Sequence, residues 1–289
     1  MEIRILRYFL AVVREESITK AAETLHITQP TLSRQLQQLE EELNTHLFIR
    51  GKHHITLTDE GMLLKKRAED IIELADKTEK EFLAQDDLIS GDICIGSGET
   101  FAMHEVGKVM KEFQELYPSI QFHLFSGNAD DVIEKLDKGL IDIGLLVEPV
   151  NIEKYDYVHL KTKDRWGVLT LKDSKLAQKS SVTAQELYDV PLMTSRRPIV
   201  QNFLSHWFQT DFDKLNIVAT YNLINNASIL VEEGIGHVLT IEKVNHNSKL
   251  PFVPFDPPLV SGNVIVWRKH QVFSKATTRF LEMLKEKYE

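Results

Sequence analysis

Residues 28–34, with the sequence Thr-Gln-Pro-Thr-Leu-Ser-Arg, combine short polar side chains with one basic side chain. Glutamine can form two hydrogen bonds with adenine, and arginine can form two with guanine. At the start of a helix, such groups would reach base edges and phosphates in the major groove of DNA. Any amphipathic helix also exposes a polar face, so the segment alone does not decide this. The candidate contacts to double-stranded DNA here are Thr28, Gln29, Pro30, Thr31, Ser33 and Arg34.

Three helices are expected to position that segment. Residues 3–13 place apolar side chains at helical spacing. Ser17 can cap a second helix that buries Ala21, Ala22 and Leu25. Thr28 is expected to cap a third helix, with a proline in its first turn, where a missing N–H costs little. The leucines that the third helix is expected to bury are Leu32, Leu36, Leu39 and Leu43.

Residues 46–58 are expected to form a small β-hairpin, or wing, after the third helix. Two short apolar runs flank the turn Gly51-Lys52-His53-His54. Basic groups near the tip of such a wing suit phosphates or the minor groove, and the candidates are Arg50, Lys52 and His53. Neighbouring residues of a hairpin point to opposite faces, so His53 and His54 are not expected to share a metal ion.

A long helix is predicted to begin after Thr58, with Asp59 and Glu60 favourable at its positive end. Apolar or small residues then recur at alternating spacings of four and three, which is typical of a seam between two helices. We expect this seam to be a dimer interface, and the alternative is a helix that lies on its own domain. The seam residues are Leu64, Ala68, Ile71, Ala75, Thr78 and Phe82.

The remaining residues alternate between strand-like and helix-like runs, which predicts α/β sheets with helical crossovers. Strands are expected at residues 92–96, 120–125, 141–146, 166–171, 191–194, 216–220, 237–241 and 263–268. Helices are expected at residues 101–116, 128–138, 184–189, 198–208, 223–233 and 275–287.

Ligands of open α/β sheets bind at the carboxyl ends of the strands, which directs attention to the loops that follow them. Arg196 or Arg197 would favour a carboxylate there. Glu99 and Glu148 would repel a carboxylate, or would select an amine or a polar neutral molecule, so the ligand stays open. The candidate ligand contacts are Gly98, Glu99, Thr100, Phe101, Ser126, Asn128, Glu148, Thr194, Ser195, Arg196 and Arg197.

The motifs at residues 17–25, 28–36, 39–40, 43, 47–48, 50 and 57–61 resemble, in order and spacing, the signature of the LysR-type transcriptional regulator family. The resemblance implies contacts with a DNA groove by Gln29, Pro30, Ser33 and Arg34. It also implies a contact with the DNA backbone by Arg50. The wing tip carries less arginine than that of many relatives. The resemblance also implies that the long helix pairs the DNA-binding domains of two copies.

The fold implied by the resemblance is an α/β effector domain that follows an N-terminal all-α winged helix-turn-helix domain and a long linker helix. The effector domain would be two-lobed, like a periplasmic binding protein. The expected domains are residues 1–58, the linker or dimerisation helix and hinge at 59–90, and the effector domain at 91–289. Lobe one would hold residues 91–162 and 268–289, and lobe two residues 163–267, with crossovers near Lys163 and Arg268.

The function implied by the resemblance is sequence-specific DNA binding that regulates transcription. A small-molecule effector between the lobes would modulate DNA binding or activation, with contacts at Thr100 and the loop after Thr194. The implied partners are DNA, the effector and further copies of the chain, as a homodimer or a homotetramer. RNA polymerase is an additional candidate partner. The rival interpretation is a ligand-binding or catalytic α/β protein whose N-terminal helices serve only oligomerisation.

Composition agrees with a two-domain globular protein of 289 residues. The net charge is −9, but residues 1–67 hold ten Lys and Arg against nine Asp and Glu, so the acidity lies in the rest of the chain. The single cysteine, Cys94, excludes an internal disulfide and is expected in the core. Without a signal peptide or an apolar span, a cytoplasmic location is expected.

The rival interpretation of a catalytic protein predicts a recognisable catalytic sequence pattern. The chain contains no His-Glu-x-x-His, no phosphate-binding loop and no Gly-x-Ser-x-Gly elbow. The glycines at 96 and 98 lack the third glycine of a dinucleotide fingerprint. We therefore expect no enzyme, no catalytic residue, no cofactor and no metal site.

Overall fold

The computed structural model describes residues 1–50, 55–83, 89–242 and 250–288. Internal contacts divide the chain into two compact units, Met1–Ala84 and Gln85–Glu289. The long helix belongs to the first unit, because Ala68 and Leu64 pack in its hydrophobic core. The predicted boundary at residue 58 therefore separates a helix from the core on which it packs.

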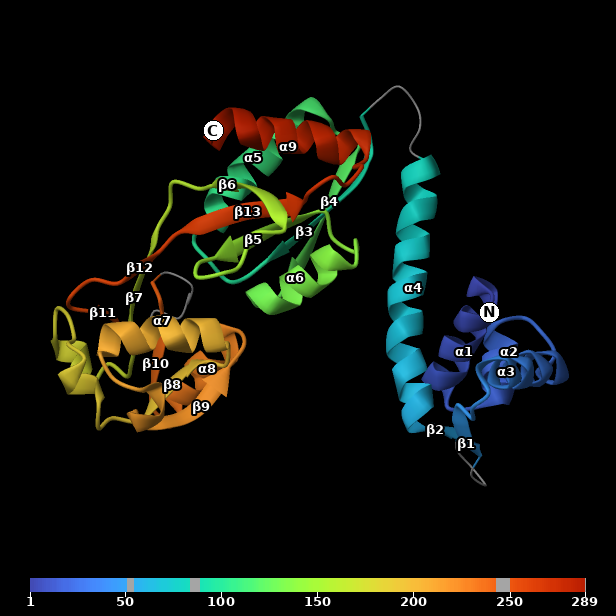
Figure 1. Cartoon of the computed structure of the whole chain (residues 1–289), viewed down its shortest axis with the longest axis horizontal. Helices are drawn as coiled ribbons and strands as arrows, with labels where there is room; N and C mark the ends of the chain where they lie inside the picture. The colour runs from blue at the N-terminus through green and yellow to red at the C-terminus, as the bar shows by residue number, and fades with distance from the viewer. Residues whose placement is uncertain (51–54, 84–88, 243–249, 289) are drawn as a thin grey trace. The chain divides into compact units, whose positions relative to one another are not determined.

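The N-terminal unit contains the predicted helices and hairpin (Figure 1). Ser17 caps the second helix, and its hydroxyl accepts a hydrogen bond from the backbone N–H of Lys20. The hairpin is antiparallel, with Phe48 opposite Leu57. The elements are α1 (Ile3–Glu15), α2 (Ile18–Thr24), α3 (Gln29–Leu43), β1 (Phe48–Arg50), β2 (Ile55–Leu57) and α4 (Asp59–Leu83).

Two local features fix the hairpin against α3 and α4. The carboxylate of Glu40 accepts hydrogen bonds from the backbone N–H groups of Leu47 and Phe48, at 2.7 and 3.4 Å. Gly61 in α4 lies so close to the carbonyl oxygen of Leu47 that an added Cβ would collide with it. The Thr58 hydroxyl accepts from the Gly61 N–H and so caps the start of α4.

The helix that carries the polar segment differs from expectation in two details. Leu32, Leu36 and Leu39 are buried as predicted, but Leu43 is 39% exposed. Leu43 is the last residue of α3, and it lies beyond the part of the helix that contacts the core. Thr28 occupies the N-cap position without forming the predicted side-chain cap.

The predicted seam along α4 divides between two environments. Leu64 and Ala68 pack in the core of the N-terminal unit, so the alternative of a helix lying on its own domain holds for this end of α4. Farther along, Ile71 and Leu74 are exposed, and Phe82 is 68% exposed. Among the described side chains of α4, Met62 and Leu63 of the first half are exposed as well, and the second half exposes Ile71, Leu74 and Phe82.

Lobe one of the C-terminal unit is a sheet with helices on both faces (Figure 1). Strands β3 and β4 are parallel, and so are β3 and β5, whereas β13 runs antiparallel to β5 and β6. Helices α5 and α9 share a core on one face, and α6 packs on the other. Cys94, expected in the core, is half-buried in β3. The elements are β3 (Gly91–Ser97), α5 (Met103–Leu116), β4 (Ile120–Ser126), α6 (Ala129–Asp137), β5 (Ile143–Val147), β6 (Tyr155–His159), β13 (Asn263–Arg268) and α9 (Lys275–Tyr288).

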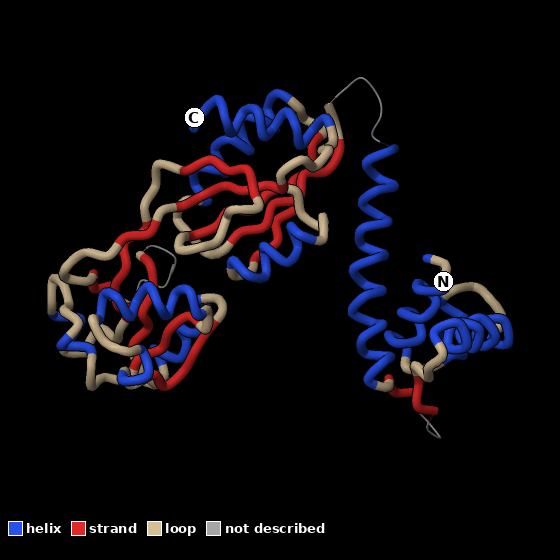
Figure 2. Tube along the Cα trace, viewed as in Figure 1, coloured by secondary structure: helices blue, strands red, loops and turns tan. Residues whose placement is uncertain are grey.

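Lobe two is a second sheet in the order β11-β7-β10-β8-β9, with β12 beside β7. Helix α7 packs in one apolar cluster and α8 in another. Figure 2 shows the strands of the two lobes as separate groups, each flanked by helices. The elements are β7 (Asp164–Leu169), η1 (Leu176–Gln178), η2 (Gln185–Leu187), β8 (Leu192–Ser195), α7 (Pro198–Phe208), η3 (Phe212–Lys214), β9 (Ile217–Tyr221), α8 (Ile224–Glu232), β10 (His237–Ile241), β11 (Phe252–Pro254) and β12 (Val260–Ser261).

The second crossover between the lobes lies at Gly262 rather than near Arg268. Strand β13 pairs with β5 and β6, so residues 263–267 belong to lobe one and not to lobe two. Each predicted strand exists within a few residues, but β6, β11 and β12 were not predicted. Two of these are very short, and β6 exposes most of its residues. The helix expected at 184–189 is only the short turn η2.

Gly61→Ala is expected to lower the free energy of unfolding of the N-terminal unit by about 1–3 kcal/mol, because a Cβ there overlaps the Leu47 carbonyl. Gly107→Ala in α5 is the matched control. Among the described residues no atom lies within 4 Å of an added Cβ at Gly107. That change should instead stabilise the C-terminal unit by about 0.5–1 kcal/mol. Thermal unfolding of the full chain, resolved by hydrogen exchange, measures both, and equal effects would contradict the argument.

Candidate functional site

The polar segment at the start of α3 faces outward. Gln29, Pro30, Thr31 and Arg34 are exposed, and Ser33 is half-buried. Leucines 32, 36 and 39 of the same helix are buried against α1 and α2. Burial of one face thus presents the hydrogen-bonding groups of the other face to a partner.

The N-terminus of α3 is open to an anion. The hydroxyls of Thr28 and Thr31 hydrogen-bond to each other at 2.8 Å, so Thr28 does not cap a backbone N–H. The first turn of α3 contains no acidic side chain. Backbone N–H groups and the helix dipole at such a terminus suit a phosphate group.

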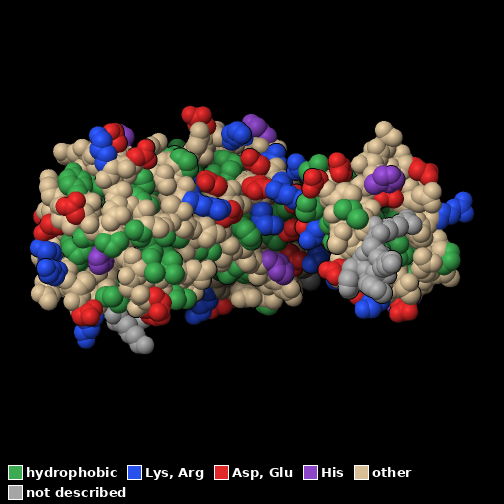
Figure 3. Space-filling view, turned by 90° about the horizontal axis from the view of Figure 1, so that it is seen from below, with side chains coloured by type: hydrophobic (Ala, Val, Ile, Leu, Met, Phe, Trp, Pro, Cys, Tyr) green, Lys and Arg blue, Asp and Glu red, His purple; other side chains and the backbone are tan. Residues whose placement is uncertain are grey.

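The wing is described only in part. Strands β1 and β2 are in place, but the predicted contacts Lys52 and His53 lie outside the described residues. The side chain of Arg50 lies outside them as well. On the face shown in Figure 3, acidic and basic side chains are interspersed, so the net charge of −9 forms no single acidic surface there.

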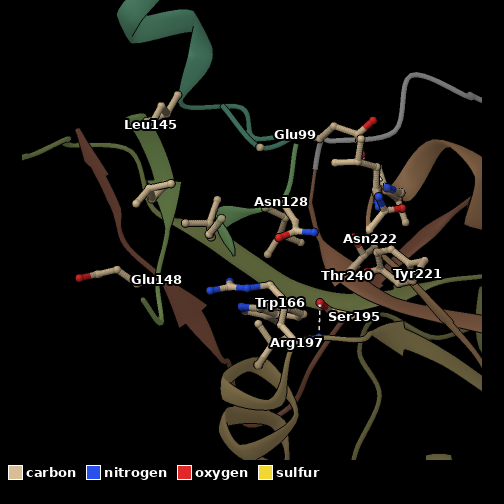
Figure 4. Close-up of a pocket in the computed structure, with 18 residues that line it drawn as sticks. Glu99, Asn128, Leu145, Glu148, Trp166, Ser195, Arg197, Tyr221, Asn222 and Thr240 are labelled. Atoms are coloured by element: carbon tan, nitrogen blue, oxygen red, sulfur yellow. Dashed lines mark hydrogen bonds between the residues drawn. The ribbon is translucent and has the colours of Figure 1, made fainter. Parts of the chain in front are cut away.

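A pocket of about 110 Å³ lies in the C-terminal unit and is lined by residues of both lobes. Helices α6, α7 and α8 begin beside it, at Ala129, Pro198 and Ile224. Three helix N-termini therefore face one space, and each favours negative charge. Figure 4 shows the polar side chains of the pocket between the strand ends of the two lobes.

Glu99 of lobe one occupies one of these termini, across the cleft. Its carboxylate accepts a 2.6 Å hydrogen bond from the backbone N–H of Ile224, the first residue of α8. Partial burial raises the pKa of Glu99 above its usual value, and the hydrogen bonds from Ile224 and Asn225 oppose that rise. The carboxylate thus links the lobes and covers the start of α8.

Arg197 makes a second link between the lobes. Its Nε donates to the carboxylate of Asp130 in α6 at 3.0 Å. The side chain of Arg197 is only 8% exposed, whereas that of Asp130 is 61% exposed. Solvent around Asp130 screens this ion pair, so its contribution to stability is modest. The ion pair holds the guanidinium of Arg197 beside the N-terminus of α6.

A buried hydrogen-bond network holds the two crossover segments together. The Thr100 hydroxyl lies 2.8 Å from an Asp164 carboxylate oxygen and 2.9 Å from the side-chain oxygen of Asn263. Asn263 Nδ2 donates to the same oxygen of Asp164 at 2.8 Å. Because β7 begins at Asp164 and β13 at Asn263, this network sits where both chains pass between the lobes.

The two units match one protein family in separate, consecutive stretches. Residues 3–62 match the family described as "Bacterial regulatory helix-turn-helix protein, lysR family". Residues 86–289 match the "LysR substrate binding domain". The chain belongs to the LysR family of transcription regulators. It is a DNA-binding regulator with an effector-binding domain, in a non-enzymatic family, so the rival interpretation of an enzyme or ligand-binding protein without DNA binding is wrong.

Curated LysR-type relatives match over nearly the whole chain. The uncharacterized HTH-type transcriptional regulator YvbU of Bacillus subtilis is 28% identical, with 99% of this chain and 98% of YvbU covered. The Hca operon transcriptional activator HcaR of Escherichia coli is 30% identical, with the same coverage of 99% and 98%. The crystal structure of full-length CbnR with its target DNA matches at a TM-score of 0.76 and 20% identity, covering 99% of both chains. That similarity shows the fold.

The effector domain brings six of the predicted ligand contacts together. These residues come from four loops of both lobes, and they are Gly98, Glu99, Asn128, Glu148, Ser195 and Arg197. Thr100 does not line the pocket, since its hydroxyl joins the crossover network. Thr194 is buried, and Arg196 is exposed outside the pocket. Phe101 and Ser126 are also absent from the lining.

Sequence reasoning missed several lining residues of this LysR-type pocket. Trp166 is buried, and it also lines the pocket. Tyr221 and Thr240 line it from the ends of β9 and β10. Their signal was the same as that of Ser195, a polar side chain at the end of a strand.

The described part of this LysR-type chain contains no group of three or more His, Cys, Asp or Glu that could hold a metal ion. None of its described helices is both long enough and apolar enough to span a bilayer.

Glu99→Gln is expected to stabilise the folded chain more at neutral pH than at low pH. Because the folded state raises the pKa of Glu99, ionisation costs stability as the pH rises from the ordinary value through the raised value. Glutamine removes that cost and keeps an oxygen that can accept from Ile224. Denaturant unfolding at several pH values measures the difference between the variant and the original chain. A difference that stays constant with pH would show that the pKa of Glu99 is not raised.

Proposed function

We propose that each copy of the chain reads one half of a two-fold DNA site with the face of α3 that carries Gln29, Ser33 and Arg34. Gln29 and Arg34 would hydrogen-bond to base edges, and Ser33 to a base or a phosphate. The observation that carries the proposal is the exposure of this face above a buried row of leucines. The buried face of α3 therefore anchors the helix in its domain, and the exposed face is available for DNA recognition.

Contacts with the DNA phosphates would set the register of α3 on the duplex. The open N-terminus of α3, with Thr28, Pro30 and Thr31, is suited to a phosphate. Arg50, Lys52 and His53 of the wing would contact a neighbouring phosphate or the minor groove, as the sequence predicts. Such contacts carry little sequence information and weaken as the salt concentration rises.

We further propose that a small-molecule effector binds in the pocket between the lobes. The support is the convergence of six predicted contacts from both lobes on one cavity, with three helix N-termini beside it. An effector that contacts both lobes would favour one inter-lobe geometry over others. In an oligomer, that preference would change the placement of the DNA-binding units, which makes the two sites energetically coupled.

Self-association is proposed along the second half of α4. Ile71, Leu74 and Phe82 leave apolar side chains exposed there, beside Thr78 of the predicted seam. Burial of such side chains is the main favourable contribution to protein association. A dimer built this way presents two α3 helices to two half-sites, and the homotetramer implied by the family would combine two dimers.

Arg34→Ala is expected to weaken binding to the specific DNA site by about 1–3 kcal/mol and to relax base preference at one position, because a bidentate contact to a base is lost. Binding to a set of single-base operator variants, measured at fixed salt concentration, tests this. Arg14→Ala is the matched control, since Arg14 is an exposed arginine of the same unit that pairs with Glu15. If Arg34→Ala and Arg14→Ala changed affinity and base preference alike, the assigned role of Arg34 would be wrong.

Ile71→Glu is expected to shift the chain toward monomers, because a carboxylate would replace apolar surface at the proposed interface. Sedimentation velocity over a range of concentrations measures the shift, which we expect to be about tenfold or more in the dissociation constant. Met62→Glu places the same change at another exposed apolar residue of α4, on the opposite side of the helix. Unchanged association of the Ile71 variant would place the dimer interface elsewhere.

A further inference from the structure

The strongest unused donor at the inter-lobe pocket is the guanidinium of Arg197. Its Nε is paired with Asp130, but in the described part of the chain no acceptor contacts either terminal nitrogen. The side chain is more than nine-tenths buried, so water does little to solvate these nitrogens. A buried charge with donors left over is costly unless a ligand or ordered water completes its hydrogen bonds.

Asn128 supplies a second donor to the same pocket. It is 7% exposed, and its side-chain oxygen accepts from the backbone N–H groups of Asp130 and Asp131. This capping arrangement assigns the oxygen to α6 and leaves the Nδ2 group as the remaining polar group of a side chain that lines the pocket (Figure 4). Nδ2 has no acceptor among the residues that the structure describes. Ser195, whose hydroxyl accepts from the N–H of Arg197, lines the same pocket.

Apart from that of Asp130, which is paired with the Nε of Arg197, the carboxylates near the pocket are directed elsewhere. Glu99 is bound to the N-terminus of α8. Glu148 lines the edge of the pocket, and Figure 4 shows its carboxylate pointing away from Arg197 and Asn128. It lies against Gly262, where an added Cβ would collide with it. The charge conflict left open by the sequence is thus resolved in favour of the donors.

The rest of the pocket wall is largely apolar and the space is small. Leu145, Val147, Trp166, Val200 and Ile241 line it. Two polar hydrogens of lining residues are already used, because Trp166 donates to Ser261 and Tyr221 donates to the carbonyl of Leu239. The volume of about 110 Å³ is smaller than the about 150 Å³ of a cavity that holds benzene.

We propose that the effector is a short-chain monocarboxylic acid. This inference rests on the proposed function, which places the effector in this pocket. The carboxylate accepts from the terminal nitrogens of Arg197 and from Asn128 Nδ2, and the hydrocarbon chain packs on the apolar wall. Charge-assisted, paired hydrogen bonds of this kind are the strong ones. Inorganic phosphate fits less well, because it carries more charge than one guanidinium offsets and leaves the apolar wall unfilled.

Thermal shift and calorimetric titration of the full chain with butyrate, butyramide, butylamine, benzoate and inorganic phosphate test the proposal. Butyrate should bind at least about tenfold more tightly than butyramide, because only the carboxylate supplies a negative charge and two acceptor oxygens for the guanidinium of Arg197. Arg197→Gln should remove that preference, and Arg197→Lys should restore part of it. Arg196→Gln is the matched control, since Arg196 is exposed and lies outside the pocket lining, and it should leave butyrate binding unchanged.

Two results would overturn the ligand class. One is binding of butyramide or butylamine as tight as that of butyrate, and the other is the absence of binding by butyrate. Should Arg197→Gln fail to fold, the ligand series on the original chain still decides between acid, amide and amine. Failure of the ligand class leaves the regulator function intact, because DNA binding by the original chain and its loss in Arg34→Ala are measured without any ligand.

Discussion

The buried hydrogen bonds among Thr100, Asp164 and Asn263 are the constraint on which the effector domain depends. The chain passes twice between the lobes, and the first residue after each passage takes part in this network. Each group is removed from water, so separating the partners would leave polar atoms unsatisfied at substantial cost. The network therefore fixes the point about which the lobes are arranged, and the pocket lies beside that point.

Adjacent residues connect the pocket with this fixed point. Glu99 reaches across to α8, and its neighbour Thr100 joins the crossover network. A change at the start of α8 would act on Glu99, and the peptide bond would pass the displacement to Thr100. Coupling of this kind needs no long pathway, because one short loop of lobe one touches both a helix of lobe two and the crossing strands.

Much of this architecture could be predicted from the sequence, because it depends on local pattern. The polar start of α3, the cap at Ser17 and the strand ends that carry Asn128 and Ser195 all follow from spacing and residue type. Other features depend on which elements become neighbours. The periodicity of α4 shows an apolar face but not its partner, so Leu64 and Ala68 were assigned to a seam although they pack in their own unit. The membership of β13 in lobe one likewise depends on pairing across a long stretch of chain.

The charge conflict at the pocket shows why residue type alone could not identify the ligand. Three helices begin there, and each N-terminus attracts an anion, but the occupants differ. Asn128 and Asp131 cap α6 and Glu99 caps α8, whereas α7, with Arg197 at its N-cap position, has no side-chain cap and no acidic residue in its first turn. Acidic side chains therefore occupy the N-termini of α6 and α8. The N-terminus of α7 instead carries the buried guanidinium of Arg197. The N-terminus of α7 differs from those of α6 and α8 in the hydrogen bonds that the neighbouring side chains form. Those hydrogen bonds are a property of the folded chain.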